Sequence, residues 1–164
     1  MDTSANAKPI DASFPAEIID AFVAATATAF QELCGTEVSV REASAEAQDL
    51  RFDVVANMFL RHDPPGQLTL AFPLSVLEKL TRRYSGDSVS LTPDLLDDAA
   101  GEFLNVIAGQ AKTMLKESPA HYLLSIPSVH HPSGDRSIPL ESNAIAWRFD
   151  CDCGSFVLKA CLPR

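Results

Sequence analysis

The stretch Thr92–Lys116, TPDLLDDAAGEFLNVIAGQAKTMLK, decides how the chain is interpreted. It predicts one long helix over Pro93–Lys116. The Thr92 side chain can cap free backbone N–H groups, and proline is tolerated at the first helical position. Acidic residues gather near the start of this helix and lysines near its end, so both suit the helix dipole. Pro119 marks the stop.

This predicted helix has two chemically different faces. Residues three or four positions apart share a face of a helix, so the sequence can be divided between the faces. The apolar arc, expected to be buried, holds Leu95, Leu96, Ala99, Phe103, Leu104, Val106, Ile107, Ala111, Met114 and Leu115. The narrow polar stripe holds Asp98, Glu102, Asn105, Gly109, Lys112 and Lys116.

Two residues of the polar stripe are unusual for a face that meets only water. Asn105 is a poor helix former at mid-helix, and Gly109 costs about 1 kcal/mol relative to alanine there. A glycine on an exposed face gains nothing from core packing, but it allows another surface to approach closely. The stripe is therefore predicted to be a docking face, with Glu102 and Asn105 projecting into a partner.

The rest of the chain predicts an α+β fold with a largely antiparallel sheet, in the order helix, strands, two helices, strands. Hairpins dominate and no strand–helix–strand rhythm appears. A first helix, rich in alanine and threonine, opens at Phe14–Pro15, ends before Gly35 and is expected to pack closely against a neighbour. The other predicted elements are strands at 38–41, 51–61 and 67–72, a helix at 73–84, a strand at 122–129 broken by Pro127, a loop at 130–139, and a terminal hairpin of strands 144–151 and 155–162.

Composition and charge narrow the functional classes. A chain of 164 residues that is 46% hydrophobic can build one domain with a proper core, predicted over residues 14–164 after a loose tail at 1–13. A net charge of −9 argues against nucleic-acid or anionic-lipid partners. No secretory signal is evident, and no run approaches the ~20 apolar residues that span a bilayer. We therefore expect a cytoplasmic protein without a membrane or nucleic-acid partner.

Three of the four cysteines, Cys151, Cys153 and Cys161, lie near the end of the chain. The spacing Cys151-x-Cys153 differs from the C-x-x-C of zinc and thioredoxin-type sites. These thiols could bind a metal together with His130 and His131, which precede them. The simpler interpretation is that the thiols are buried on strands and the histidines belong to a loop. The sequence thus predicts no metal site.

The motif in the long helix resembles that of CheC, CheX and the related flagellar-switch phosphatases. Their motif is Asp or Ser, three residues, Glu, two residues, Asn, and a Pro a little over twenty residues later. This chain has Asp98, Glu102, Asn105 and Pro127 in that order. A chain of this composition would match the three helical positions by chance roughly 0.04 times. The element order is also similar, over roughly Pro15–Leu162.

The first helix favours a CheX-like member with one site over a CheC-like member with two. Ser13, Glu17 and Asp20 stand at the motif spacing, but Asp20 replaces the asparagine. A carboxylate there would repel a phosphoryl group and has no amide N–H to donate. The resemblance to CheX further implies a homodimer.

The resemblance implies hydrolysis of the aspartyl phosphate of a phosphorylated CheY-like receiver domain. Asn105 would orient the attacking water, and Glu102 would pair with the active-site lysine of the receiver. Asp98, Gly109 and Pro127 would support docking. The Mg²⁺ ion would come from the receiver, so this chain is expected to bind no cofactor of its own.

Other interpretations remain open at this point. The polar stripe could be an ordinary solvated helix face. The same fold could be an adapter that binds a receiver or signalling partner without hydrolysing anything. A small-molecule sensor is a third possibility, and it would need an enclosed apolar pocket.

Overall fold

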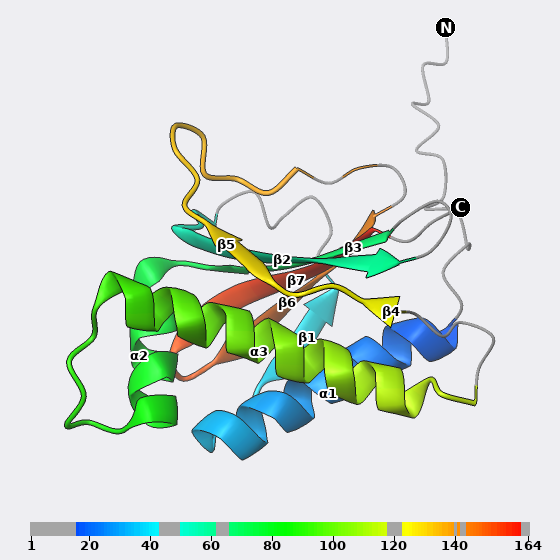
Figure 1. The fold of residues 1–164 in the computed structure, drawn as a ribbon, viewed down its shortest axis with the longest axis horizontal. Helices are drawn as coiled ribbons and strands as arrows, with labels where there is room; N and C mark the ends of the chain where they lie inside the picture. Colours follow the sequence, from blue (N-terminus) through cyan, green and yellow to red (C-terminus); the bar gives the residue numbers. More distant parts are fainter. Residues whose placement is uncertain are drawn as a thin grey trace, which may run out of the picture.

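In the computed structural model, residues 16–42, 50–61, 66–117, 123–139, 141 and 144–161 are described. They form an antiparallel sheet with helices α1 (Ala16–Cys34), α2 (Leu74–Ser85) and α3 (Pro93–Met114) packed on one face (Figure 1). The α+β class predicted from the sequence is confirmed. The predicted tail at residues 1–13 lies outside the described residues. None of the described helices is long and apolar enough to cross a membrane.

The sheet is built from two hairpins joined side by side. Its order is β1 (Ser39–Glu42), β6 (Ala144–Cys151), β7 (Gly154–Cys161), β3 (Gly66–Phe72), β2 (Val54–Arg61) and β4 (Leu123–Leu124), and β5 (Ser128–His130) also pairs with β2. Both predicted hairpins, β2–β3 and β6–β7, are present. Strand β2 begins at Val54 rather than at 51, and just before it the Phe52 N–H donates to the Arg136 carbonyl instead of to a neighbouring strand.

The segment that carries Pro127 forms two short strands rather than one. Both β4 and β5 pair with β2, and Ile126 and Pro127 lie between them. Proline has no N–H to donate to a sheet ladder, so the predicted break at Pro127 is confirmed. Strand β5 runs alongside α3 (Figure 1).

Helix α3 starts as its sequence predicts and ends slightly earlier. Thr92 Oγ1 accepts a hydrogen bond from the Leu95 N–H at 3.2 Å, and Pro93 is the first helical residue. The helix ends at Met114 instead of Lys116, because residues 115–117 tighten into a turn in which the Lys116 N–H donates to the Thr113 carbonyl. The alanine-rich face of α1 packs against α3, as expected.

An aromatic cluster between sheet and helices holds α3 in place. The Phe103 ring of α3 lies 5.2 Å from Phe30 of α1 and 6.2 Å from Phe72 of β3. Phe156 of β7 completes the cluster, at 4.7 Å from Phe30. Trp147 is also buried in the core. With its apolar side held this way, α3 must turn its opposite side outward.

Candidate functional site

The exposed side of α3 is the polar stripe predicted from the sequence. Asp98 and Asn105 are exposed, and Glu102 and Gly109 are partly exposed. The fully buried side consists of Leu96, Ala99, Ala100, Phe103, Leu104, Ile107, Ala108 and Ala111. Met114 was predicted to be buried but is 49% exposed, because α3 ends there and its side chain lies at the edge of a groove.

The two glycines of α3 meet different surroundings. A Cβ added at Gly109 would have no neighbour within 4 Å, so the helix surface is open at this point. A Cβ added at Gly101 would lie 3.9 Å from Pro127 Cβ and 3.8 Å from Val129 Cγ2. Gly101 therefore marks the side of α3 against which β5 packs. Pro127 therefore lies beside Gly101, the residue that immediately precedes Glu102.

The side of α3 that faces β5 fixes the arrangement of the stripe. Asp98 and Asn105 lie three residues before and four residues after Gly101, so they share the side of the helix next to β5. At about 100° per residue, Asn105 is turned from Gly101 by about 40°, Asp98 by about 60° and Glu102 by about 100°, all in the same direction. Ile126, which directly precedes Pro127, is 89% exposed.

The polar side chains of the stripe have no partner within the described part of the chain. Asp98, Glu102 and Asn105 make no hydrogen bond or ion pair with any described residue. By contrast, Gln110 on the same helix donates from Nε2 to Glu32 Oε2 of α1 at 3.0 Å. The carboxylate of Glu102 and the amide of Asn105 are therefore available to bind another molecule.

A cavity of about 340 Å³ lies at the N-terminal end of α3. Its polar lining includes Asp53, Glu78, Asp97 and His131, and His131 Nε2 lies 3.0 Å from Asp97 Oδ2. Sequence reasoning missed this pair, because 34 residues separate the two partners and neither belongs to a recognisable pattern. The other histidine, His130, contacts Asn57 Nδ2 through its Nδ1 at 3.0 Å.

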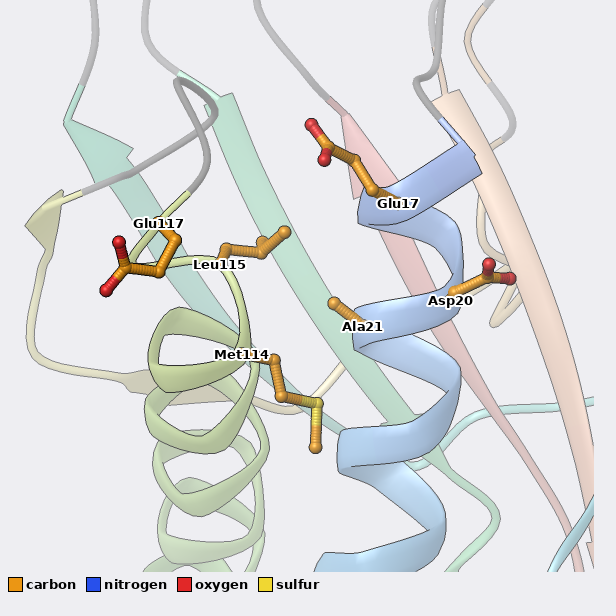
Figure 2. Close-up of a pocket in the computed structure, with 6 residues that line it drawn as sticks. All are labelled: Glu17, Asp20, Ala21, Met114, Leu115 and Glu117. Atoms are coloured by element: carbon orange, nitrogen blue, oxygen red, sulfur yellow. The ribbon is translucent and has the colours of Figure 1, made fainter.

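A second groove, of about 500 Å³, lies between the start of α1 and the end of α3 (Figure 2). Ala21, Met114 and Leu115 supply apolar side chains to it. Glu17, Asp20 and Glu117 also line it, and in Figure 2 the carboxylates of Asp20 and Glu117 point away from the apolar side chains. The acidic residues at its rim disfavour an anionic ligand. Ser13, which stands at the motif spacing before Glu17 and Asp20, lies outside the described residues.

Comparison with known protein families identifies the family of this chain. The family model described as "Chemotaxis phosphatase CheX" matches residues 54–151, which contain the stripe and Pro127. The chain belongs to the CheX family. The matched region contains all of α3 and leaves out Glu17 and Asp20 of α1. No curated protein matches the chain.

Solved structures agree with CheX membership at the level of the fold. CheX from Vibrio vulnificus superposes with a TM-score of 0.75 at 20% identity, covering 88% of this chain and 95% of that one. CheX from Desulfovibrio desulfuricans gives 0.73 at 24% identity, covering 90% and 99%. The CheX–CheY–BeF3–Mg²⁺ complex from Borrelia burgdorferi gives 0.64 at 13% identity, covering 87% and 95%.

Proposed function

We propose that this CheX family chain hydrolyses the aspartyl phosphate of a phosphorylated CheY-like receiver domain. The observation that carries the proposal is the open stripe of α3. It presents Glu102 and Asn105 without described partners, on a surface where Gly109 leaves room for a second protein. The CheX–CheY complex among the structural neighbours supports a receiver as the partner class.

Asn105 is assigned the chemical step. An aspartyl phosphate is already reactive, so a catalyst gains most by holding a water in line with the leaving carboxylate. The amide oxygen accepts from that water and the NH2 group can donate, without adding negative charge beside the phosphoryl group. The water oxygen bonds to phosphorus as the phosphorus–carboxylate bond breaks. The products are inorganic phosphate and the free aspartate.

Glu102 is assigned the docking step. Its carboxylate would pair with the active-site lysine of the receiver and so fix the register of the two proteins. Asp98 and Pro127 would support the contact on the β5 side. The Mg²⁺ would belong to the receiver. We further propose a single domain over residues 14–164, acting in the cytoplasm as a homodimer.

The test is the lifetime of the phosphoryl group on a labelled receiver. We expect the purified chain to shorten that lifetime catalytically, at concentrations far below that of the receiver. A chain that binds the phosphorylated receiver but leaves its phosphate lifetime unchanged would be an adapter, and the enzymatic proposal would be wrong.

Replacing Glu102 by alanine should weaken docking more than chemistry. Losing one partner of an interfacial charge pair costs about 2 kcal/mol or more, so KM for the phosphorylated receiver should rise about 30-fold while kcat changes little. Steady-state kinetics of phosphate release measure both constants. Glu117→Ala, an exposed glutamate that follows the same helix outside the stripe, is the matched control. An unchanged KM in Glu102→Ala would refute the docking role.

Replacing Gly109 by alanine should separate stability from function. Alanine is the better helix former, and the added methyl group has no described neighbour, so the free energy of unfolding should rise by about 0.5–1 kcal/mol. The same methyl group should obstruct the receiver and raise KM. Urea unfolding and phosphate-release kinetics report the two effects. Gly101→Ala, whose methyl group would contact Pro127 and Val129 at ordinary distances, should leave KM unchanged.

Replacing Ile126 by serine should also impair docking. The side chain is 89% exposed and directly precedes Pro127, which lies beside Gly101 of α3, so burying it under the receiver would contribute about 1–2 kcal/mol. KM should rise several-fold at unchanged kcat. Leu123→Ser is the control: Leu123 is 56% exposed, but it pairs with Arg61 and shares the sheet face opposite the helices. Equal effects of the two substitutions would argue against a contact specific to Ile126.

A further inference from the structure

The tight turn between β6 and β7 gathers sulfur and oxygen atoms at one point. Cys151 ends β6 and pairs with Gly154, which begins β7, so Asp152 and Cys153 form the turn itself. One carboxylate oxygen of Asp152 and the Sγ atoms of Cys151 and Cys153 all lie within 4.8 Å of one another. Cys153 is buried although it lies in a turn, which corrects the expectation that it would lie on a strand.

The backbone of this turn is held close to α2. Gly154 has a φ of 122°, which side chains rarely tolerate, and an added Cβ would lie 2.6 Å from Val76 Cγ2 of α2. Only glycine fits at this position. The turn is therefore packed against α2, and the Cys151 Sγ donates to the Gly154 carbonyl at 3.3 Å, a proton that it would release on binding an ion.

Arg83 of α2 orients the carboxylate. Its Nη1 and Nη2 atoms donate to Asp152 Oδ1 and Oδ2, each at 2.8 Å, and Nη1 also donates to Thr36 Oγ1. These hydrogen bonds hold the pKa of Asp152 below its usual value. Each carboxylate oxygen keeps a second lone pair, so Asp152 can still bind a cation. Hydrogen-bonded carboxylates of this kind are typical of metal ligands.

Cys34, at the end of α1, lies outside this group. Burial, reinforced by the nearby Cys153, raises the pKa of Cys34 to about 12, and its Sγ donates to the Leu80 carbonyl at 3.5 Å. Cys34 therefore remains a protonated thiol of the core. His130 and His131 contact Asn57 and Asp97 instead and do not belong to the group.

We propose that Cys151, Asp152 and Cys153 form a binding site for a thiophilic divalent metal ion, with Zn²⁺ as the representative ion. Thiolate ligands select such ions through Zn–S bonds of about 2.3 Å, and the two Sγ atoms of the turn already lie within 4.8 Å of each other. Two thiolates and a carboxylate, balanced by Arg83 and a divalent ion, would make a neutral cluster. The exposed Asp152 leaves the fourth position open to water.

This proposal is independent of the phosphatase proposal. The turn is supported by α2, whereas the phosphatase stripe lies on α3, and no residue is common to both. Loss of metal binding would therefore leave the phosphatase activity unchanged, and loss of the phosphatase activity would leave metal binding unchanged.

The test uses the reduced, metal-free full chain. Zn²⁺ affinity is measured by competition with a chromogenic chelator, and Co²⁺ binding is followed through the thiolate-to-metal charge-transfer band. We expect one Zn²⁺ per chain, with Cys151→Ser and Cys153→Ser each weakening binding at least about 100-fold. Cys161→Ser removes a thiol on β7 outside the group and should bind like the wild type.

Two results would overturn the proposal. One is the absence of a thiolate–cobalt band in the wild-type chain, which needs no variant and so does not depend on how the variants fold. The other is equal weakening in Cys161→Ser and Cys151→Ser, which would indicate adventitious binding to any thiol.

Discussion

Replacing Asn105 by alanine should lower kcat for phosphate release from a phosphorylated receiver by about 100-fold or more. Removing a single preorganised group that acts on the reacting atoms typically costs a factor of 10²–10³. Asn105 is exposed and makes no described hydrogen bond, so the substitution removes the amide without disturbing a described contact. Alanine is also a better helix former, so α3 should be at least as stable. Single-turnover decay of the labelled receiver isolates the chemical step.

Gln110→Ala is the matched control for Asn105→Ala. It removes an amide from the same helix, but that amide is bonded to Glu32 of α1 and lies outside the stripe. Its rate of phosphate release should match that of the wild type. If Asn105→Ala remains as fast as the wild type, Asn105 does not orient the attacking water and the mechanism proposed here is wrong. If both variants are slow, the loss reflects a disturbed helix rather than the missing amide of Asn105.

Replacing Phe103 by alanine should lower the free energy of unfolding by about 3–5 kcal/mol, the usual cost of deleting a buried phenyl ring. Phe103 has no exposed surface. Its ring meets Phe30, Phe72 and Tyr84 at centroid distances of 5.2, 6.2 and 5.6 Å. The cavity would open between α1, α3 and the sheet, where collapse requires helices to move. Urea unfolding by circular dichroism measures the change.

Phe59→Ala provides the comparison for Phe103→Ala. The same ring is deleted from a strand, but it is 53% exposed, so stability should fall by well under half as much. A similar loss of unfolding free energy in both variants would show that the aromatic cluster around Phe103 adds no more stability than an exposed phenylalanine does. The packing of Phe103 also affects the candidate site, because Phe103 directly follows Glu102 in α3. Its burial is what turns the carboxylate of Glu102 toward solvent.

Local patterns in the sequence were sufficient for the helix that carries the site. The Thr92 cap, the adjacent proline and the alternation of apolar and polar residues act within one or two turns, so their consequences can be predicted without the fold. The same holds for both hairpins, whose turns are short. The prediction for Met114 was wrong, because burial at a helix end depends on what packs beside it. Helix periodicity alone does not contain that information.

Contacts between segments that are distant in the sequence could not be predicted from it. Asp97 and His131 meet only because β5 returns alongside α3, and Arg83 meets Asp152 because the β6–β7 turn packs on α2. The spacing of Cys151 and Cys153 predicted no metal site, since it matched no known ligand pattern. Only the packed turn places the two thiols and the carboxylate within reach of one ion.

By itself, the sequence determined the α+β class, the limits of most elements and the polar stripe of Asp98, Glu102, Asn105 and Gly109. Periodicity and capping are short-range effects, and each of these features depends on them. The tertiary structure alone decided that Pro127 packs beside Gly101, that Ile126 is left 89% exposed, and that the surface above Gly109 is open among the described residues. These features depend on how the sheet closes against α3, since close packing brings together residues that no local pattern relates.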